Sequence, residues 1–339
     1  MSTLQIVWFS LIAILWVGFF FLEGFDFGVG MQFVSLAKDE EERDSLYESI
    51  GPHWDANEVW LITAGGAMFA AYPGWYASLF SGFYLLLFGV LLALIFRGVA
   101  FEFREKLPTL KARRLWGNLI ALASFAVPFL FGMIFLAVVT GVPLDARGNV
   151  SANFGTYVRP ITLVGGLGLV LLSYVHGLNF TMLKQTNTEI LAKAKSHLKT
   201  AYTLLLAGEV ILAGLLLWQT DFLATKPVIT LVLLAVVVLA TLVSWHQAHY
   251  DRQGWAFTLS GLTIIAVVSL LFVGLFPRVI VDVNGVHDLL ATTASSSPYT
   301  LHLMTWIVSG ALPLTLGYQL WSFYVFKERV QENHIFTEE

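Results

Sequence analysis

Long apolar runs separated by short polar segments follow one another along almost the whole chain. A bilayer core about 30 Å thick needs roughly 20 apolar residues per helix, so such runs predict membrane-spanning helices. The run 59–96 has no charged residue and is too long for one helix, and Pro73-Gly74 marks a tight turn that divides it into two spans. The other runs are 4–22, 115–140, 160–183, 200–220, 227–245, 255–276 and 303–326. The pattern therefore predicts an all-α polytopic membrane protein with nine transmembrane helices.

Composition supports a membrane protein and excludes several other classes. Hydrophobic residues make up 57% of the 339 residues and charged residues only 12%, compared with roughly 45–50% and 25% in soluble proteins. The net charge of −4 provides no basic face for nucleic acid. The chain has no cysteine, which excludes disulfides, iron–sulfur clusters, cysteine-based zinc sites and covalently attached haem.

The distribution of basic residues predicts the orientation. Most of the 19 Lys and Arg residues follow the first, third, fifth and seventh predicted spans or lie in the C-terminal segment. Because basic loops stay in the cytoplasm, we expect the N-terminus outside and the C-terminus in the cytoplasm. The polar segment 145–156 divides the spans, so we expect a single integral membrane domain, 1–339. Its parts are two four-helix bundles, 1–144 and 157–277, plus one additional helix, 300–326.

Ionisable residues cluster near the predicted cytoplasmic ends of the first three spans. A charge at the centre of a membrane helix costs roughly 2.5–3.5 kcal/mol on insertion scales, so each one needs a partner or a role. Glu23 and Asp26 are three residues apart, as are Asp55 and Glu58, so each pair shares a helical face. Arg97 closes the third span. We expect the two carboxylate pairs and the arginine to meet in one polar pocket.

Two interpretations of this pocket stay open. Neighbouring, partly desolvated carboxylates can take up and release protons near neutral pH, which predicts a proton path from the cytoplasm. Alternatively, these residues are interfacial charges that pair with Arg97 and cap the second span. Gly24 and Gly28 allow close helix packing, and Gly51-Pro52 places helix-disrupting residues next to Asp55. For Asp55 and Asp26 these features give the proton-transfer interpretation the same weight as the ion-pair interpretation.

Other candidate residues give weaker signals. Glu209 lies near the middle of the sixth predicted span, either as a functional residue or as a protonated, hydrogen-bonded helix contact. The histidines fall at or beyond the predicted span ends, so we expect no haem ligand and no metal site in this chain. They are His53, His176, His197, His246, His249, His287, His302 and His334. No phosphate-binding, serine-hydrolase or zinc-protease motif is present, so we expect no catalytic residue in this chain.

The run GPHWDANEVWL at 51–61 resembles the signature of subunit II of the cytochrome bd quinol oxidases. The segments EGFDFGVG at 23–30, FRGV at 96–99 and MTW at 304–306 resemble the same family. Ala56 stands where the family commonly has glycine, which is a small-for-small change. The aromatic and amide positions of the first run are Trp54, Asn57 and Trp60.

The resemblance implies a subunit of a membrane oxidase that oxidises quinol and reduces dioxygen to water. Subunit I, the expected obligate partner, would carry two b-type haems and one d-type haem, while this chain would act as its scaffold in the bacterial plasma membrane. Some family members hold a quinone in subunit II as a structural ligand, and some complexes include a small accessory subunit. The sequence does not distinguish ubiquinol from menaquinol.

The resemblance also implies roles for individual residues. Asp55 matches the position associated with proton uptake toward the oxygen-reducing haem, and Asp26 and Arg97 match motif positions. Glu58 stands where glutamine also occurs. We therefore expect Asp55, Asp26, Glu58 and Glu23 to line a proton path and Arg97 to form a structural ion pair. The alternatives are a secondary transporter, which carboxylates at depth would suit, and an assembly scaffold without a proton role.

Overall fold

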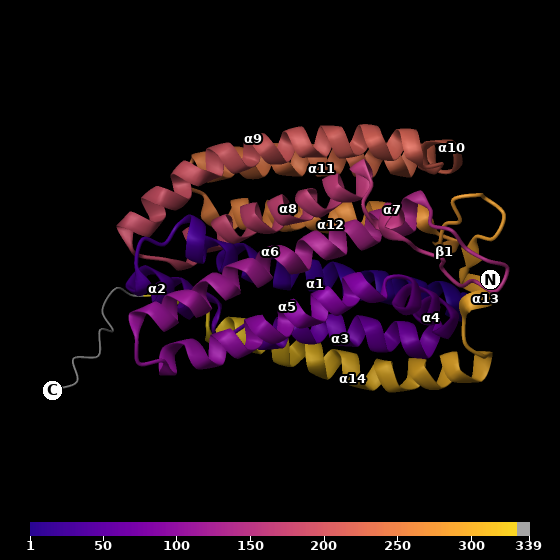
Figure 1. Ribbon diagram of the computed structural model, residues 1–339, viewed down its shortest axis with the longest axis horizontal. Helices are drawn as coiled ribbons and strands as arrows, with labels where there is room; N and C mark the ends of the chain where they lie inside the picture. The colour runs from indigo at the N-terminus through magenta and orange to yellow at the C-terminus, as the bar shows by residue number, and fades with distance from the viewer. Residues whose placement is uncertain (331–339) are drawn as a thin grey trace.

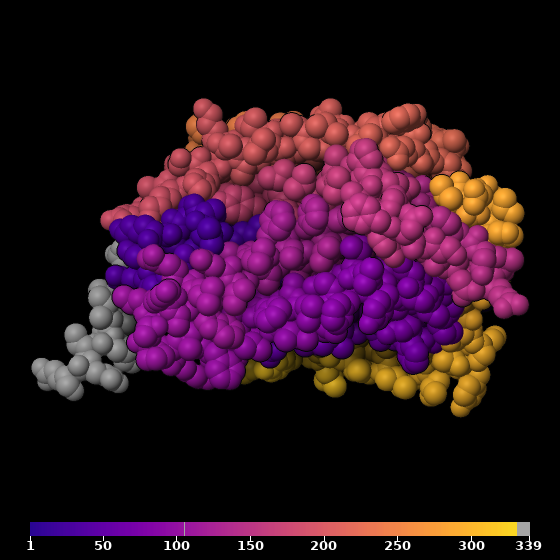
Figure 2. Space-filling model, viewed as in Figure 1, coloured from indigo at the N-terminus to yellow at the C-terminus, as the bar shows by residue number. Residues whose placement is uncertain are grey.

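The computed structural model of the protein describes residues 1–330, which form a bundle of long helices aligned along its longest axis (Figure 1). The long helices are α1 Thr3–Ser35, α3 Trp54–Ala71, α5 Tyr84–Phe103, α6 Leu110–Thr140, α8 Pro160–Lys184, α9 Thr188–Gln219, α11 Pro227–His249, α12 Gln253–Leu275 and α14 Pro298–Val325. The short elements are α2 Glu40–Ile50, α4 Pro73–Gly82, η1 Arg104–Lys106, α7 Phe154–Tyr157, α10 Phe222–Thr225, α13 Ala291–Ala294 and the antiparallel strands β1 Arg278–Ile280 and β2 Leu289–Leu290. In the space-filling view, α14 forms one edge of the molecule and α9 forms the opposite edge (Figure 2).

Eight helices in the described part of the chain are long and apolar enough to cross a membrane. They are α1, α5, α6, α8, α9, α11, α12 and α14. The predicted second span corresponds to α3, which is 18 residues long and is not among these eight. Its first two turns include Asp55, Asn57 and Glu58, which lower its hydropathy. The helical membrane class is confirmed, and the ninth span stays a prediction.

Two predicted span boundaries are wrong. The first span was expected to end near Leu22, but α1 continues to Ser35. Its carboxylates do not end the helix because they have polar partners on neighbouring helices, described below. The third span was expected to start at Pro73, but Pro73 begins the separate helix α4, and α5 starts only at Tyr84.

Helix α4 is set apart from α5 because the loops at that end of the bundle pack against it. Ser78 Oγ donates to the carbonyl of Gly148 at 2.6 Å, which anchors the loop before α7. A Cβ added at Gly74 would lie 3.0 Å from Cα of Ala294 in α13. Helices α4 and α13 lie beside the N-terminus in Figure 1. This end of the bundle therefore has its own small layer of short elements.

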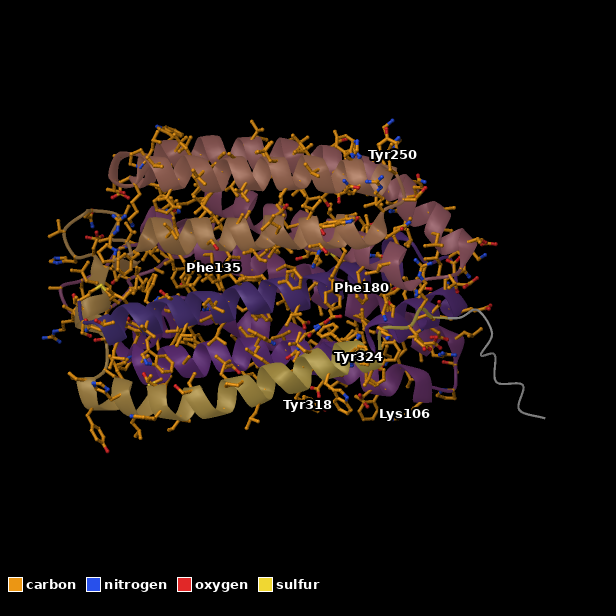
Figure 3. The ribbon with its side chains drawn as sticks, turned by 180° about the vertical axis from the view of Figure 1, so that it is seen from behind. Lys106, Phe135, Phe180, Tyr250, Tyr318 and Tyr324 are labelled. Carbon is orange, nitrogen blue, oxygen red and sulfur yellow. The ribbon has the colours of Figure 1, made fainter. Side chains whose placement is uncertain are left out.

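Helix α1 lies at the centre of the bundle and packs against α3, α6, α8 and α12. Gly28 and Gly177 form its crossing point with α8, because a Cβ added at Gly28 would lie 2.6 Å from Cα of Gly177. Aromatic rings fill the space toward α6, where Trp16 meets Phe135 edge-to-face at 5.0 Å. Phe135 and Phe180, labelled in Figure 3, lie among the helices rather than on an outer edge of the bundle. Helix α1 thus forms the core of the bundle.

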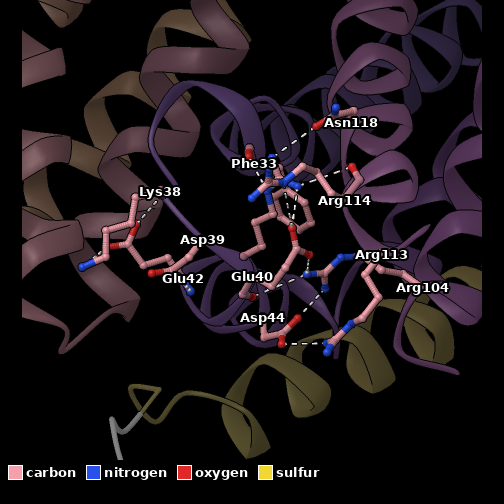
Figure 4. A network of polar contacts seen from close by, with 11 residues as sticks. Phe33, Lys38, Asp39, Glu40, Glu42, Asp44, Arg104, Arg113, Arg114 and Asn118 are labelled. Atoms are coloured by element: carbon pink, nitrogen blue, oxygen red, sulfur yellow. Dashed lines mark hydrogen bonds and ion pairs between the residues drawn. The ribbon is translucent and has the colours of Figure 1, made fainter. Parts of the chain in front are cut away.

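The opposite end of the bundle carries α2 and many of the basic residues, and we call it the basic end (36–53, 104–114, 184–199 and 249–252). A network of ion pairs joins α2 to η1 and α6 there (Figure 4). Glu40 accepts from Arg43 at 2.8 Å and from Arg104 at 2.7 Å, and Asp44 accepts from Arg104 at 2.5 Å and from Arg113 at 2.9 Å. Burial lowers the pKa of Arg43. Glu40 is therefore the shared partner of two buried guanidinium groups.

We expect Glu40→Ala to lower the free energy of unfolding by about 3 kcal/mol, because removing one partner leaves buried charges unpaired. Thermal unfolding of the purified protein in detergent measures the change. The control is Glu41→Ala, since Glu41 is the next residue of α2 and is exposed. Equal stability of the two variants would show that the network contributes nothing to the fold.

Candidate functional site

A buried ion-pair cluster joins α1, α3 and α5. Arg97 of α5 is fully buried, and its Nη1 donates to Glu23 of α1 and, at 3.0 Å, to Oε1 of Glu58 of α3. The rings of Phe27 and Phe101 lie 4.7 and 5.0 Å from the guanidinium carbon, at cation–π distance. Arg97 thus forms ion pairs with two carboxylates, Glu23 and Glu58.

A chain of side-chain hydrogen bonds continues from the cluster to α14. Asn57 Nδ2 donates to Oδ2 of Asp26 at 2.7 Å, and Gln319 Nε2 donates to Oδ1 of Asn57 at 3.2 Å. Trp60 Nε1 donates to Oε1 of Gln319 at 3.1 Å. Asp26 and Asn57 are fully buried, and Asp26 also interacts with Glu23 one turn earlier on α1. The structure therefore brings Glu23, Asp26 and Glu58 together around one guanidinium.

Asp55 does not join this buried group. It is exposed at the start of α3, on the same side as Val59 and Ile62, which are also exposed. Three residues turn a helix by about 300°, so the side chains of Asp55 and Glu58 diverge by about 60°. That divergence directs Glu58 toward Arg97 and leaves Asp55 on the surface, so the expectation that both pairs meet in one pocket is wrong for Asp55.

The remaining signature residues have packing roles. The ring of Trp54 is half-buried, with its centroid 5.0 Å from that of Phe101. Trp60 packs on Gly18 of α1, where an added Cβ would lie 2.2 Å from the indole ring. Sequence reasoning missed Gln319, although a polar amide within an apolar predicted span could have marked it. No sequence signal distinguishes Phe27 and Phe101 from the other phenylalanines.

The position of one histidine, His176, differs from the prediction. His176 was placed at a span end, but it lies within α8 and is fully buried. One ring nitrogen, Nδ1, bonds Ser260 Oγ at 2.7 Å and the other, Nε2, bonds the carbonyl of Phe21 at 3.2 Å, so neither is free for a haem iron. His53 stacks on Phe323 at 4.4 Å, and burial together with the charge of Lys184 lowers the pKa of His53 to about 4.

Within residues 1–330, apart from the undescribed side chain of Glu105, no group of three or more His, Asp, Glu or Cys residues is arranged to hold a metal ion. His334 lies outside the described residues. The ionisable residues at depth instead form a polar group of carboxylates, one guanidinium and amides. Such a group can bind and exchange protons, and it joins α1, α3, α5 and α14.

Comparisons with known proteins give a consistent result. The family model for cytochrome bd terminal oxidase subunit II matches residues 4–326. Cytochrome bd ubiquinol oxidase subunit 2 of Bacillus subtilis (strain 168) is 39% identical over 338 residues, covering 99% of this chain and 100% of that protein. Cytochrome bd-I ubiquinol oxidase subunit 2 of Escherichia coli (strain K12) is 30% identical over 369 residues, covering 98% and 97%.

A solved structure shows the same fold. A chain in the structure of bd oxidase from Geobacillus thermodenitrificans superposes with a TM-score of 0.73, covering 96% of this chain and 99% of that chain, at 15% sequence identity. The eight apolar helices and the bacterial relatives identify a multi-pass protein of the bacterial inner membrane. The family match over nearly the whole length is decisive: the chain belongs to the cytochrome bd terminal oxidase subunit II family.

Proposed function

We propose that this chain scaffolds the haem-bearing subunit I of a quinol oxidase and supplies a path for protons taken up from the cytoplasm. The relatives from Bacillus subtilis and Escherichia coli are named as subunits of ubiquinol oxidases, which supports a quinol as the reductant. The two b-type haems and the d-type haem belong to subunit I in this proposal. The engaged ring nitrogens of His176 support that assignment.

The imbalance of charge in the buried cluster carries the proposal. Glu23, Asp26 and Glu58 surround a single guanidinium, that of Arg97, so the fully ionised cluster would carry an excess of negative charge within the bundle. Uncompensated buried charge is costly, which favours protonation of part of the cluster. Glu23 Oε2 and Asp26 Oδ1 receive no hydrogen bond from any described residue, and a shared proton would satisfy both. The cluster is thus suited to hold and exchange protons.

The position of Asp55 supports a role at the start of this path. It is exposed at the basic end of α3, one turn before Glu58, which bonds Arg97. Reduction of dioxygen to water takes up protons, and the surface of α3 near Asp55 would deliver them to subunit I or to Glu58. In this scheme the basic end faces the cytoplasm.

We further propose that α3 is the ninth span and that α14 follows two four-helix units. The units are α1, α3, α5 and α6, then α8, α9, α11 and α12. The polar side chains Asn57 and Glu58 of α3 turn toward the cluster, while Ile62 and Phe69 are exposed as a lipid-facing or partner-facing side requires. The loops of the basic end support a cytoplasmic location for that end and an external N-terminus.

An apolar cavity supports a structural quinone in this chain. It has a volume of about 680 Å³ and is lined mainly by α3, α4, α5, α6 and α12, with Phe69, Phe88 and Leu91 in its lining. Gly65 and Gly66 of α3 face open space there. An isoprenoid chain matches such a lining because both are apolar.

We expect Asp55→Asn to leave assembly and haem content unchanged while lowering quinol-driven oxygen consumption at least about tenfold, because proton delivery by a positioned group contributes factors of this size or larger. Oxygen electrode measurements on the purified complex, together with proton uptake in liposomes, test this expectation. Glu102→Gln is the matched control, since Glu102 is exposed at the same end of the bundle. Full turnover and full proton uptake in Asp55→Asn would contradict the proton path and support a role as an assembly scaffold only.

A further inference from the structure

A second polar group lies within the second four-helix unit, away from the Arg97 cluster (Glu23, Asp26, Asn57, Glu58 and Arg97). Glu209 of α9 is 8% exposed, and its Oε1 accepts a hydrogen bond from Thr241 Oγ1 of α11 at 2.6 Å. The Thr241 hydroxyl lies 3.1 Å from Thr263 Oγ1, near the centre of α12. The other oxygen, Oε2, is buried and has no hydrogen-bond partner among residues 1–330. Only one of the two oxygens of this carboxyl group therefore has a hydrogen-bond partner, at mid-depth in the bundle.

Glu209 borders a small apolar cavity of about 70 Å³. Its other lining side chains, from α1, α6, α8, α9, α11 and α12, are all uncharged and almost all aliphatic or aromatic. Gly165, Gly168 and Gly208 also line it, which keeps the space next to the carboxyl group open. A carboxylate without a counter-charge is very costly in such a setting, so the surroundings favour the neutral acid.

Several hydrogen-bonding side chains lie in a row from Glu209 toward the basic end, and we call this row the file. Ser244 lies one helical turn beyond Thr241 on α11, and its hydroxyl is 2.6 Å from that of Tyr202 on α9. Asn179 of α8 donates to the Tyr202 hydroxyl at 2.7 Å, and its own Oδ1 is buried without a partner among the described residues. Ser260, one turn from Thr263 on α12, bonds His176, the other titratable side chain beside the file.

We infer that Glu209 is a proton-binding site inside the membrane that exchanges its proton with water at the basic end through Thr241, Ser244 and Tyr202. The proton resides on the carboxyl group, and hydroxyl groups and the Asn179 amide provide donors and acceptors along the way. The file has two gaps: the helical turn between Thr241 and Ser244, a rise of about 5 Å, and the step from the fully buried Tyr202 to water at the basic end, less than one turn from Lys199. This site goes beyond the proposed Asp55 route and shares no residue with it.

Infrared spectroscopy of the intact complex in lipid tests the inference. The C=O stretching band of a protonated carboxylic acid is expected in the wild-type spectrum and is expected to be lost in Glu209→Gln. On transfer to D2O the band should shift to lower frequency, because the O–H becomes O–D. In Tyr202→Phe the same shift should proceed at least tenfold more slowly. If Glu209→Gln fails to assemble, Thr241→Val identifies the band instead, since losing a hydrogen bond raises the C=O frequency.

Tyr250→Phe is the matched control, because Tyr250 is exposed at the end of α11 and lies off the file (Figure 3). Its exchange rate should equal that of the wild type. An acid band of equal intensity in the wild type and in Glu209→Gln would show an ionised Glu209 and overturn the inference, because that band would then come from other carboxyl groups. Equal exchange rates in Tyr202→Phe and Tyr250→Phe would overturn the route. Neither result depends on oxygen consumption, so the outcome is separate from that of the Asp55→Asn experiment.

Discussion

Replacement of Arg97 by Gln should prevent stable assembly of the complex. The guanidinium is the only cation bonded to Glu23 and Glu58 within the described residues, and both Arg97 and Glu23 are fully buried. Removing one partner of a buried ion pair typically costs about 3–5 kcal/mol. That loss is comparable with the whole stability of many domains, about 5–15 kcal/mol. A tag on this chain, followed by measurement of co-purified subunit I and haem per chain, gives the readout.

The double variant Glu23→Gln/Arg97→Gln separates structure from proton transfer. It removes the buried charge together with its main partner, so it should assemble better than Arg97→Gln alone while turning over slowly. Arg252→Gln is the control, because Arg252 is exposed at the basic end. Normal haem content and thermal stability in Arg97→Gln would mean that the buried carboxylates are neutral without their arginine partner.

Gly177→Ala should force α1 and α8 apart. An added Cβ at Gly177 would lie 2.5 Å from Cα of Gly28 and 2.7 Å from the nitrogen of Val29, and these are backbone atoms that cannot rotate away. Helices α1 and α8 must then move apart, and overpacking of this kind costs about 3 kcal/mol or more where the backbone cannot adjust. The expected result is a lower unfolding temperature and a smaller yield of folded protein.

Gly168→Ala on the same helix is the matched control. No atom lies within 4 Å of a Cβ added at Gly168, so the same chemical change should have little effect there. Scanning fluorimetry of the two purified variants compares them directly. Equal unfolding temperatures would show that the crossing of α1 and α8 is loosely packed.

The sequence predicts the helices well where apolar runs end in clear polar segments. Pro160 and Pro227 begin α8 and α11 as predicted, because proline is well suited to the first turn of a helix. The predicted boundaries are wrong where polar residues lie inside a helix instead of at its end. Glu23 and Asp26 look like the end of a span, yet they lie inside α1 because Arg97 and Asn57 satisfy them. Such partners come from distant segments, which periodicity along one helix does not reveal.

The candidate site was predicted in part. Three-residue spacing groups Glu23 with Asp26, and shared span ends bring Arg97 near them, as the structure has it. The same spacing cannot decide which member of a pair faces inward, so Asp55 was misplaced. Gln319 joins the site from α14 and lies 262 residues after Asn57 in the chain. Only the packing of α14 beside α3 brings those two amides together.

The central position of α1 has a consequence for biosynthesis. Helix α1 precedes α3 and α5 in the chain, and its Glu23 is separated by 74 residues from Arg97, the cation that it finally meets. Until α5 has been inserted, the carboxyl groups of α1 have neither the arginine nor Asn57 beside them. The nascent chain must therefore carry them into lipid as neutral acids or keep α1 at the insertion machinery until α3 and α5 arrive. Formation of the Arg97 cluster consequently marks the moment at which α1, α3 and α5 can leave that machinery together.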